Sequence, residues 1–275
     1  MSLRMPVAAE LEVPSMAMSR RSFLTRVPAG VVLPAWSPQS PPTGSVAIPE
    51  SFPSQDPALV REMVGVSHRN VARVRELLSQ RPALAKASWD WGFGDWECAL
   101  GAASHVGNRE IAELLLSTGA RPTLFSAAML GQLDTVKAFV AASPGIQKTP
   151  GPHGISLLSH AKAGGAADVV KYLEALGDAD IRFTAEPLSE PDRTAVLGTY
   201  AFGSGASDRL TTSINSRGAL VMKREGGSDR VLHHGGSRVF HPVGAEAVRI
   251  RFDAGSPSPG VTVEDGAIVL KAQRV

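Results

Sequence analysis

Apolar residues return at helical spacing through the middle of this chain, each time behind a glycine. The segments that begin at Gly107, Gly131 and Gly165 each carry an acidic residue three places later and then apolar residues three or four places apart. This periodicity predicts amphipathic helices. A glycine at each turn permits the positive φ that ends the preceding helix. The expected shared core consists of Ile111, Leu114, Leu115, Val136, Phe139, Val140, Val169, Val170 and Leu173.

Small residues precede these glycines and predict a closely packed partner for each amphipathic helix. The small residues are Ala102, Ala103, Ala127, Ala128 and Ala161. A weaker first copy, residues 70–78, has Asn70 in the glycine position. Neighbouring units of such a repeat bury faces that a single unit cannot bury alone. The sequence therefore predicts about four stacked helix pairs, an α-solenoid, over residues 51–183.

These motifs resemble ankyrin repeats, whose units open with a Thr-Pro-Leu-His-x-Ala box. Residues 156–161 occupy the box in the fourth unit and residues 98–103 occupy it in the second, and the resemblance covers roughly residues 57–180. It implies recognition of a protein partner by a concave face and hairpin loops. An insert, residues 88–97, separates the first two units, and the hairpin between the second and third units is missing.

Alternation of apolar and polar residues replaces the helical spacing after residue 183. Residues 209–214, 219–223 and 247–252 alternate in this way, with glycine-containing turns between such runs. Strands that are buried on one face show this period. Seven or eight strands fit into residues 184–275, which predicts a small antiparallel β-barrel or sandwich and makes the whole chain an α+β multidomain protein.

The C-terminal region also resembles the accessory β-domain of penicillin-binding-protein-like serine hydrolases. The similar segments are residues 196–200, 232–235, 238–242, 248–252 and 273–275. In that family the domain is an accessory module without established catalysis of its own.

The first 50 residues are rich in proline and are expected to be disordered. Residues 19–24, Ser-Arg-Arg-Ser-Phe-Leu, resemble a twin-arginine export signal. The motif predicts a periplasmic or secreted protein, with a cytoplasmic location as the alternative. Met18 directly precedes the signal, so translation could start there or at Met1, and the cleavage site stays open.

Composition narrows the classes of partner. The formal net charge is only +2 and the basic residues are scattered, so no nucleic-acid partner is expected. No apolar stretch reaches the roughly 18 residues of a transmembrane helix. Cys98 is the single cysteine, which excludes an intramolecular disulfide.

Aromatic residues crowd the insert and are the candidate partner-binding side chains. They are Trp89, Trp91, Phe93 and Trp96, and His153 in a later loop is added to them. Tryptophan is enriched in the binding hot spots of protein interfaces. The alternative is that one or two of these rings cover the end of the helical core.

Two sequence features are candidate chemical sites: the histidines for metal binding and a Ser-x-x-Lys tetrad for catalysis. His105, His153 and His160 could share a surface, but their spacing gives no support for a metal site. His233 and His234 point to opposite faces of a strand, so they do not chelate one ion easily with His241. No metal or cofactor is therefore expected.

The tetrad Ser159-His-Ala-Lys162 matches a serine-hydrolase motif, yet the companion Lys-Thr-Gly and Ser-Asp-Asn motifs are missing from the sequence. We therefore expect a non-catalytic protein-binding or scaffolding protein of the bacterial cell envelope, with no catalytic residues. The alternatives are an accessory subunit of a serine hydrolase, a weak serine hydrolase, and a small-molecule carrier that uses the β-domain.

Overall fold

The computed structural model describes residues 50–181 and 183–275. Contacts divide the chain into residues 1–48 and a compact unit of residues 49–275. The predicted export signal at residues 19–24 lies outside the described residues. Within them, no helix is both long enough and apolar enough to cross a membrane.

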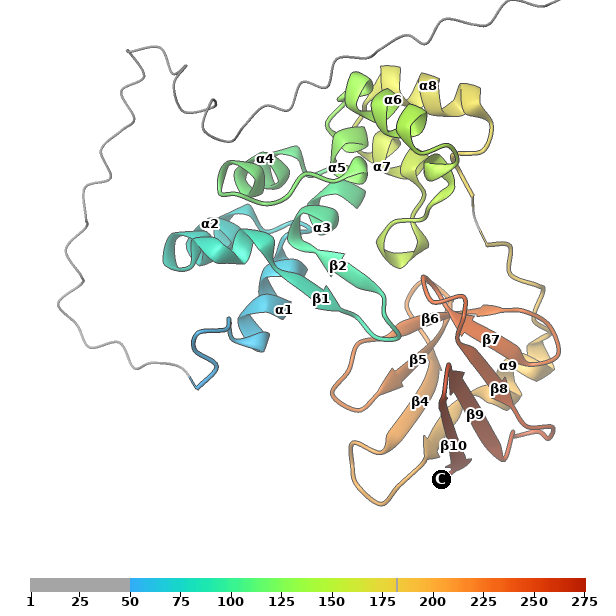
Figure 1. The fold of residues 1–275 in the computed structure, drawn as a ribbon. Helices are drawn as coiled ribbons and strands as arrows, with labels where there is room; N and C mark the ends of the chain where they lie inside the picture. Colours follow the sequence, from blue (N-terminus) through green and yellow to red (C-terminus); the bar gives the residue numbers. More distant parts are fainter. Residues whose placement is uncertain (1–49, 182) are drawn as a thin grey trace, which may run out of the picture. The chain divides into compact units, whose positions relative to one another are not determined.

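Eight α-helices occupy the first part of the described chain, and a ninth precedes the strands (Figure 1). They are α1 (Pro57–Val66), α2 (Val71–Gln80), α3 (Ala99–His105), α4 (Arg109–Ser117), α5 (Leu124–Met129), α6 (Leu133–Ala142), α7 (Leu157–Ala163), α8 (Ala167–Leu176) and α9 (Glu190–Val196). Three short 3-10 helices join them: η1 (Pro82–Lys86), η2 (Ile146–Lys148) and η3 (Pro152–Gly154). The helices pack in the pairs α1–α2, α3–α4, α5–α6 and α7–α8, and the first helices of successive pairs also pack together, α1 on α3, α3 on α5 and α5 on α7.

Side-chain caps and glycine turns determine where these helices begin and end. Asn70 and Asn108 accept hydrogen bonds from the backbone N–H groups of Arg73 and Ile111, which helix starts otherwise leave unpaired. Gly107 lies between α3 and α4 with a φ of 72°, as the sequence predicted. Five of the nine predicted core residues are buried, but they do not share one core, because Ile111 and Leu115 belong to one cluster and Val136, Val169 and Leu173 to another. The prediction for Phe139 is wrong, since its side chain is 41% exposed.

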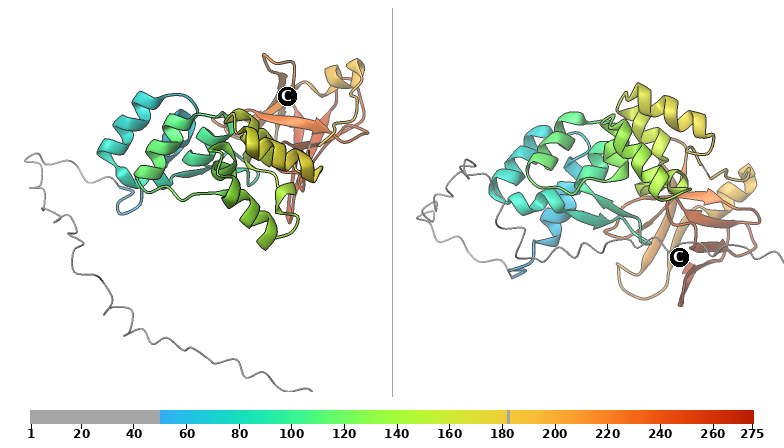
Figure 2. Two further views of the ribbon diagram at one scale, coloured as in Figure 1. Left: turned by 90° about the horizontal axis from the view of Figure 1, so that it is seen from above. Right: turned by 45° about the horizontal axis from the view of Figure 1, so that its top comes forward.

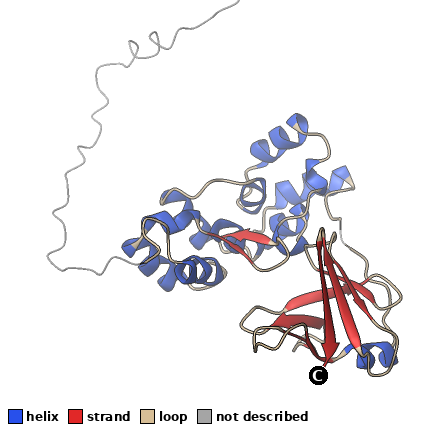
Figure 3. Cartoon of the chain, turned by 60° about the horizontal axis from the view of Figure 1, so that its bottom comes forward, coloured by secondary structure: helices blue, strands red, loops and turns tan. Residues whose placement is uncertain are grey.

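Two strands form a hairpin among the helices, where the sequence showed only an insert (Figure 3). They are β1 (Ser88–Asp90) and β2 (Trp96–Cys98). Their antiparallel register places Trp89 opposite Glu97 and Asp90 opposite Trp96. The hairpin therefore carries all four aromatic residues of the predicted partner-binding set.

The last eight strands close into an antiparallel barrel in which each strand pairs with its neighbours in sequence, and β10 returns to β3 (Figures 1 and 2). They are β3 (Gly198–Ala201), β4 (Arg209–Ile214), β5 (Leu220–Arg224), β6 (Arg230–His234), β7 (Val239–Pro242), β8 (Arg249–Phe252), β9 (Gly260–Asp265) and β10 (Ile268–Arg274). Burial alternates over residues 209–212 of β4 and along β8, as predicted. The predicted alternation over residues 219–223 is wrong, because Leu220, Val221 and Met222 of β5 are all buried. Tyr200, Phe240 and Phe252 meet in the barrel core.

The two family assignments are wrong, although the mixed α+β class with helices followed by an antiparallel barrel is confirmed. Successive helix pairs are joined by a β-hairpin, by an extended link and by two 3-10 turns, so the units lack a constant repeat. Gly turns and amphipathic helices are what any antiparallel helix pair needs, and they do not identify ankyrin repeats. Short alternating strands are likewise shared by closed barrels in general and do not identify the accessory domain of serine hydrolases. The solenoid is not shown, and the domain boundary at residues 183–184 stays a prediction.

Substitution of Gly107 by alanine should destabilise the protein more than substitution of Gly165, although both glycines have positive φ values. A Cβ on Gly107 would overlap the backbone carbonyl of Ala163, whereas a Cβ on Gly165 would meet open space. Gly165→Ala should lower the free energy of unfolding by about 1–2 kcal/mol, the cost of a left-handed backbone. Gly107→Ala should cost about 1–3 kcal/mol more because the neighbouring turn must move. Urea unfolding of both variants measures the difference, and equal losses would contradict the proposed packing of these turns.

Candidate metal centre

Four side chains from separate segments converge on one point in the helical part of the molecule. They are His68, Glu97, His105 and His153, and their potential ligand atoms all lie within 4.8 Å of one another. His68 follows α1, Glu97 lies in β2, His105 ends α3 and His153 lies in η3. We call these four residues the His3Glu cluster.

The separations within the His3Glu cluster are those expected of ligands around a single ion. The Glu97 Oε1 atom lies 2.9 Å from His105 Nε2, 3.4 Å from His153 Nε2 and 3.6 Å from His68 Nε2. The Nε2 atoms of His68 and His105 are 3.0 Å apart. Metal–ligand bonds of about 2.0–2.2 Å place tetrahedral ligands about 3.4 Å from one another. These four separations, with all ligand atoms within 4.8 Å of one another, are compatible with one ion once the side chains adjust slightly.

Outer hydrogen bonds fix the tautomers of two of these histidines. His68 Nδ1 lies 2.9 Å from the carbonyl oxygen of Gly65, and His153 Nδ1 lies 2.7 Å from Asp95 Oδ2. Carbonyl and carboxylate oxygens only accept, so each Nδ1 carries a proton. In the neutral ring the Nε2 lone pair then points into the cluster. Carbonyl or carboxylate partners of this kind orient histidine ligands in metal sites.

Glu97 is the buried charge at the centre of the cluster. Its side chain is 0% exposed, and Trp91 Nε1 donates a hydrogen bond to Oε2 at 2.8 Å. The other oxygen, Oε1, is buried and accepts no well-aligned hydrogen bond, although His105 Nε2 lies only 2.9 Å from it. An ionised carboxylate in this position requires a cation beside it.

Electrostatics in the cluster favours a bound positive charge. Burial disfavours the charged form of Glu97, but His105 and His153 more than offset it and lower the pKa of Glu97 to about 2. Burial likewise disfavours charge on His153, while Asp95 and Glu97 raise the pKa of His153 to about 9. At neutral pH the carboxylate is therefore ionised, and either a proton or a metal ion compensates its charge.

Asp95 connects the cluster to the barrel. Its Oδ1 accepts from the backbone N–H of His153 at 2.9 Å, and its Oδ2 lies 2.7 Å from Arg230 Nη1 in addition to His153 Nδ1. Arg230 also donates to the carbonyl oxygen of Val243 at 2.7 Å. Burial would raise the pKa of Asp95, but His153 and Arg230 lower it overall. A buried, ionised carboxylate thus holds the ring of His153 in place.

The loop of the hairpin brings Trp91 and Asp95 to the cluster together. The N–H of Trp91 donates to the carbonyl oxygen of Asp95 at 3.1 Å. Gly92, Phe93 and Gly94, which lie between them, all have positive φ values. Glycine adopts positive φ values without steric cost, so the tight loop depends on Gly92 and Gly94. The side chains on either side of the loop then contact Glu97 and His153.

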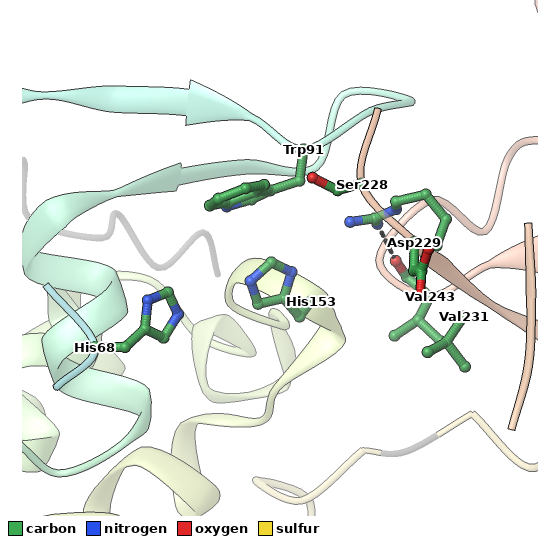
Figure 4. Close-up of a pocket in the computed structure, with 8 residues that line it drawn as sticks. His68, Trp91, His153, Ser228, Asp229, Val231 and Val243 are labelled. Carbon is green, nitrogen blue, oxygen red and sulfur yellow. Dashed lines mark hydrogen bonds between the residues drawn. The ribbon is translucent and has the colours of Figure 1, made fainter. Parts of the chain in front are cut away.

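A cavity of about 490 Å³ opens beside the cluster (Figure 4). His68 and His153 are 25% and 28% exposed, whereas His105 is 11% exposed. The cluster is therefore closed on the side of Glu97 and His105 and accessible on the side of His68 and His153. The residues that line the cavity are His68, Trp91, His153, Ser228, Asp229, Arg230, Val231 and Val243.

The predicted partner-binding residues have four different environments. Trp91 and His153 belong to the metal centre, and Phe93 packs against the barrel core. Trp89 is partly buried against the helical core. Trp96 is 63% exposed, so it alone of the five presents most of its side chain to solvent.

The Ser-x-x-Lys tetrad is not assembled as a nucleophile and base. Ser159 Oγ accepts from Ser156 Oγ at 2.9 Å, while Lys162 Nζ pairs with Glu174 at 2.8 Å. The barrel histidines form one close pair that does not include His234, whose ring packs against Phe240. His233 and His241 are register partners with ring centroids 5.6 Å apart.

The cluster differs from the histidine set His105, His153 and His160 that the sequence suggested, and from its prediction of no metal site. The structure brings His105 and His153 together and adds His68 and Glu97. His160 stays outside: its ring is 6.4 Å from that of His105 between centroids, and burial lowers its pKa to about 4. A usable signal was present, since Ser-His precedes the turn in both of the first two helix pairs, at residues 67–68 and 104–105.

Comparisons with known proteins add no family to this picture. No protein-family model matches the chain, and no curated protein matches it significantly. The resemblances to ankyrin repeats and to the serine-hydrolase accessory domain therefore gain no support from relatives. The geometry of the His3Glu cluster is the feature of this protein that indicates a function.

Proposed function

We propose that this protein binds one divalent transition-metal ion through Nε2 of His68, His105 and His153 and through Glu97. The buried Oε1 of Glu97 carries the proposal. It accepts no well-aligned hydrogen bond, and three imidazole nitrogens surround it within 3.6 Å. A single ion at the centre satisfies all four ligand atoms at once.

A single proton compensates the buried charge and the unpaired acceptor atoms of this cluster less completely than a metal ion does. With its Nδ1 proton engaged by Gly65, neutral His68 directs a lone pair at His105 and Glu97. A proton on His153 neutralises Glu97 but leaves this second lone pair pointing at the carboxylate. Imidazole-rich donor sets suit zinc, copper, iron and nickel, whereas calcium and magnesium prefer oxygen ligands. Zinc is therefore the first ion to test.

The full chain, stripped with a chelator, should bind Zn²⁺ with one ion per chain in isothermal titration calorimetry. Glu97→Gln should weaken this binding by about 100-fold or more, because it removes a charged ligand, whereas replacing an outer partner alone costs 10- to 100-fold. Glu110→Gln is the matched control. Glu110 is exposed, pairs with Arg75 and lies outside the cluster.

Circular dichroism of both variants checks that each still folds. Absence of stoichiometric zinc uptake by the unaltered chain, with Co²⁺ and Ni²⁺ also failing to bind, would overturn the metal proposal. Equal zinc affinity in folded Glu97→Gln and Glu110→Gln would place the ion elsewhere.

Asp95 should tune the affinity for the ion without contacting it. Asp95→Asn keeps an oxygen that can accept the backbone N–H of His153, but it removes the charge that orients the ring. Zinc affinity should fall by about 10- to 100-fold, as for other outer-shell partners. Asp178→Asn, at a half-buried carboxylate that pairs with Lys148 and lies outside the cluster, should leave zinc affinity unchanged. A folded Asp95→Asn protein with full zinc affinity would show that the contact between Asp95 and His153 has no role in metal binding.

A second candidate function is recognition of a protein partner without catalysis, in the bacterial cell envelope if the signal at residues 19–24 acts in export. The exposed ring of Trp96 on the β1–β2 hairpin favours it, because large exposed aromatic side chains are costly to solvate and common at interface centres. In this proposal the packed helix pairs form a short stack that presents the hairpin.

A capture experiment with the full chain as bait tests this second function. A partner retained by the unaltered protein should be lost by Trp96→Ala and kept by Ile268→Ala, since Ile268 is a similarly exposed apolar residue of β10. Loss of the partner in both variants would indicate non-specific apolar association. No partner for the unaltered chain would leave metal binding as the better-supported function.

A further inference from the structure

The His3Glu cluster is accessible from one side only, and that side faces the cavity. His68 and His153 line the cavity, whereas His105 and Glu97 lie behind them. Four protein ligands complete a tetrahedral shell, so a further ligand binds only when the ion expands its coordination, as zinc does in some catalytic sites. Such a ligand would approach an ion bound by the cluster from the cavity, between His68 and His153.

The charge around the ion defines the kind of ligand that fits. A divalent ion with three neutral imidazoles and ionised Glu97 leaves one positive charge. Asp95 and Arg230 form a buried ion pair 2.7 Å apart and neutralise each other. A ligand with a single negative charge and an oxygen donor would complete the neutralisation.

The cavity walls define the rest of that ligand. Trp91, Val231 and Val243 supply apolar surface, and Ser228 adds a hydroxyl group. Asp229 adds a carboxylate, but it is exposed, so water screens its charge from the ion. A volume of about 490 Å³ is within the range of about 300–1,000 Å³ for small-molecule sites. The walls thus favour a ligand whose body is apolar and whose anionic group points towards the two accessible histidines (Figure 4).

We infer that the metal centre holds one exchangeable ligand from this cavity, a small monoanion with an oxygen donor and an aromatic or aliphatic body. The class includes carboxylates and hydroxamates. The inference rests on the proposed metal site and adds to it the substrate or ligand class. The ion contributes the anchoring charge, while Trp91, Val231 and Val243 select the apolar body.

The full chain loaded with Co²⁺ provides the test, because its visible absorption reports on the ligands of the ion. Benzohydroxamate is the probe, and acetohydroxamate has the same donor group with a much smaller body. Benzohydroxamate should change the spectrum and bind at least tenfold more tightly than acetohydroxamate. Val231→Trp, which places a large ring in the cavity, should weaken benzohydroxamate binding at least tenfold and leave Co²⁺ uptake unchanged.

Val269→Trp is the control, because Val269 is 57% exposed on β10 and does not line the cavity. Co²⁺ uptake with a spectrum unaffected by either hydroxamate would overturn the inference while leaving the proposed metal site in place. Failure to take up Co²⁺, Zn²⁺ or Ni²⁺ would overturn both. Equal affinities for the two hydroxamates would show that the ion is open to solvent instead of to the cavity, and this comparison does not depend on the folding of any variant.

Discussion

The carboxylate of Glu97 is the constraint on which the centre of this molecule depends. It is fully buried, its pKa is lowered to about 2, and one of its oxygens accepts no well-aligned hydrogen bond. An uncompensated buried charge costs several kcal/mol, so the surroundings must supply positive charge. Three histidines from three other segments surround it, and they provide this charge either through a proton on His153 or through a metal ion that they bind. The requirement explains why polar residues occupy a place where a helical protein of this size would ordinarily bury leucine.

The β1–β2 hairpin transmits this constraint to the barrel. Glu97 faces the cluster, Asp95 holds His153 and pairs with Arg230 of β6, and Phe93 packs against the barrel core. Since Asp95 interacts with a histidine of the helical part and an arginine of the barrel, the position of His153 depends on both. Removal of one partner from a buried arginine–carboxylate pair strongly destabilises the folded protein, because the other charge is left buried without compensation. The value of the pair here is therefore geometric, because it fixes one histidine of the cluster.

Local structure followed from the sequence because short-range physics determines it. The positive φ at Gly107, Gly131 and Gly165 and the alternating burial along β4 and β8 are consequences of neighbouring residues alone. The same local rules misled the family assignment, because amphipathic helix pairs and half-buried strands look alike in unrelated folds. Phe139 shows a further limit. Its spacing is right for the core, but in α6 only Val136 is buried.

The His3Glu cluster could not be predicted from the sequence, because its members come together only through tertiary packing. His68, Glu97, His105 and His153 share no spacing that a single helix or strand could bring together. The repeated Ser-His dipeptide before two helix turns was a local signal, and it correctly marks His68 and His105. It also occurs at Ser159-His160, where the histidine bonds the carbonyl oxygen of Ser156 within its own helix and stays out of the cluster. Dipeptide identity alone therefore does not separate a ligand from a packed histidine.

The register of one short hairpin decides which chemistry the molecule can present. Side chains alternate along β2, so exposed Trp96 and buried Glu97 point to opposite sides. A slip of one residue would place an indole among three imidazoles and expose the carboxylate to solvent. Asp95 and Trp91 resist such a slip, since each is bonded both to the hairpin backbone and to a member of the cluster. The two candidate functions differ, but both depend on the same backbone register. That register directs Glu97 inward towards an ion and Trp96 outward towards a partner.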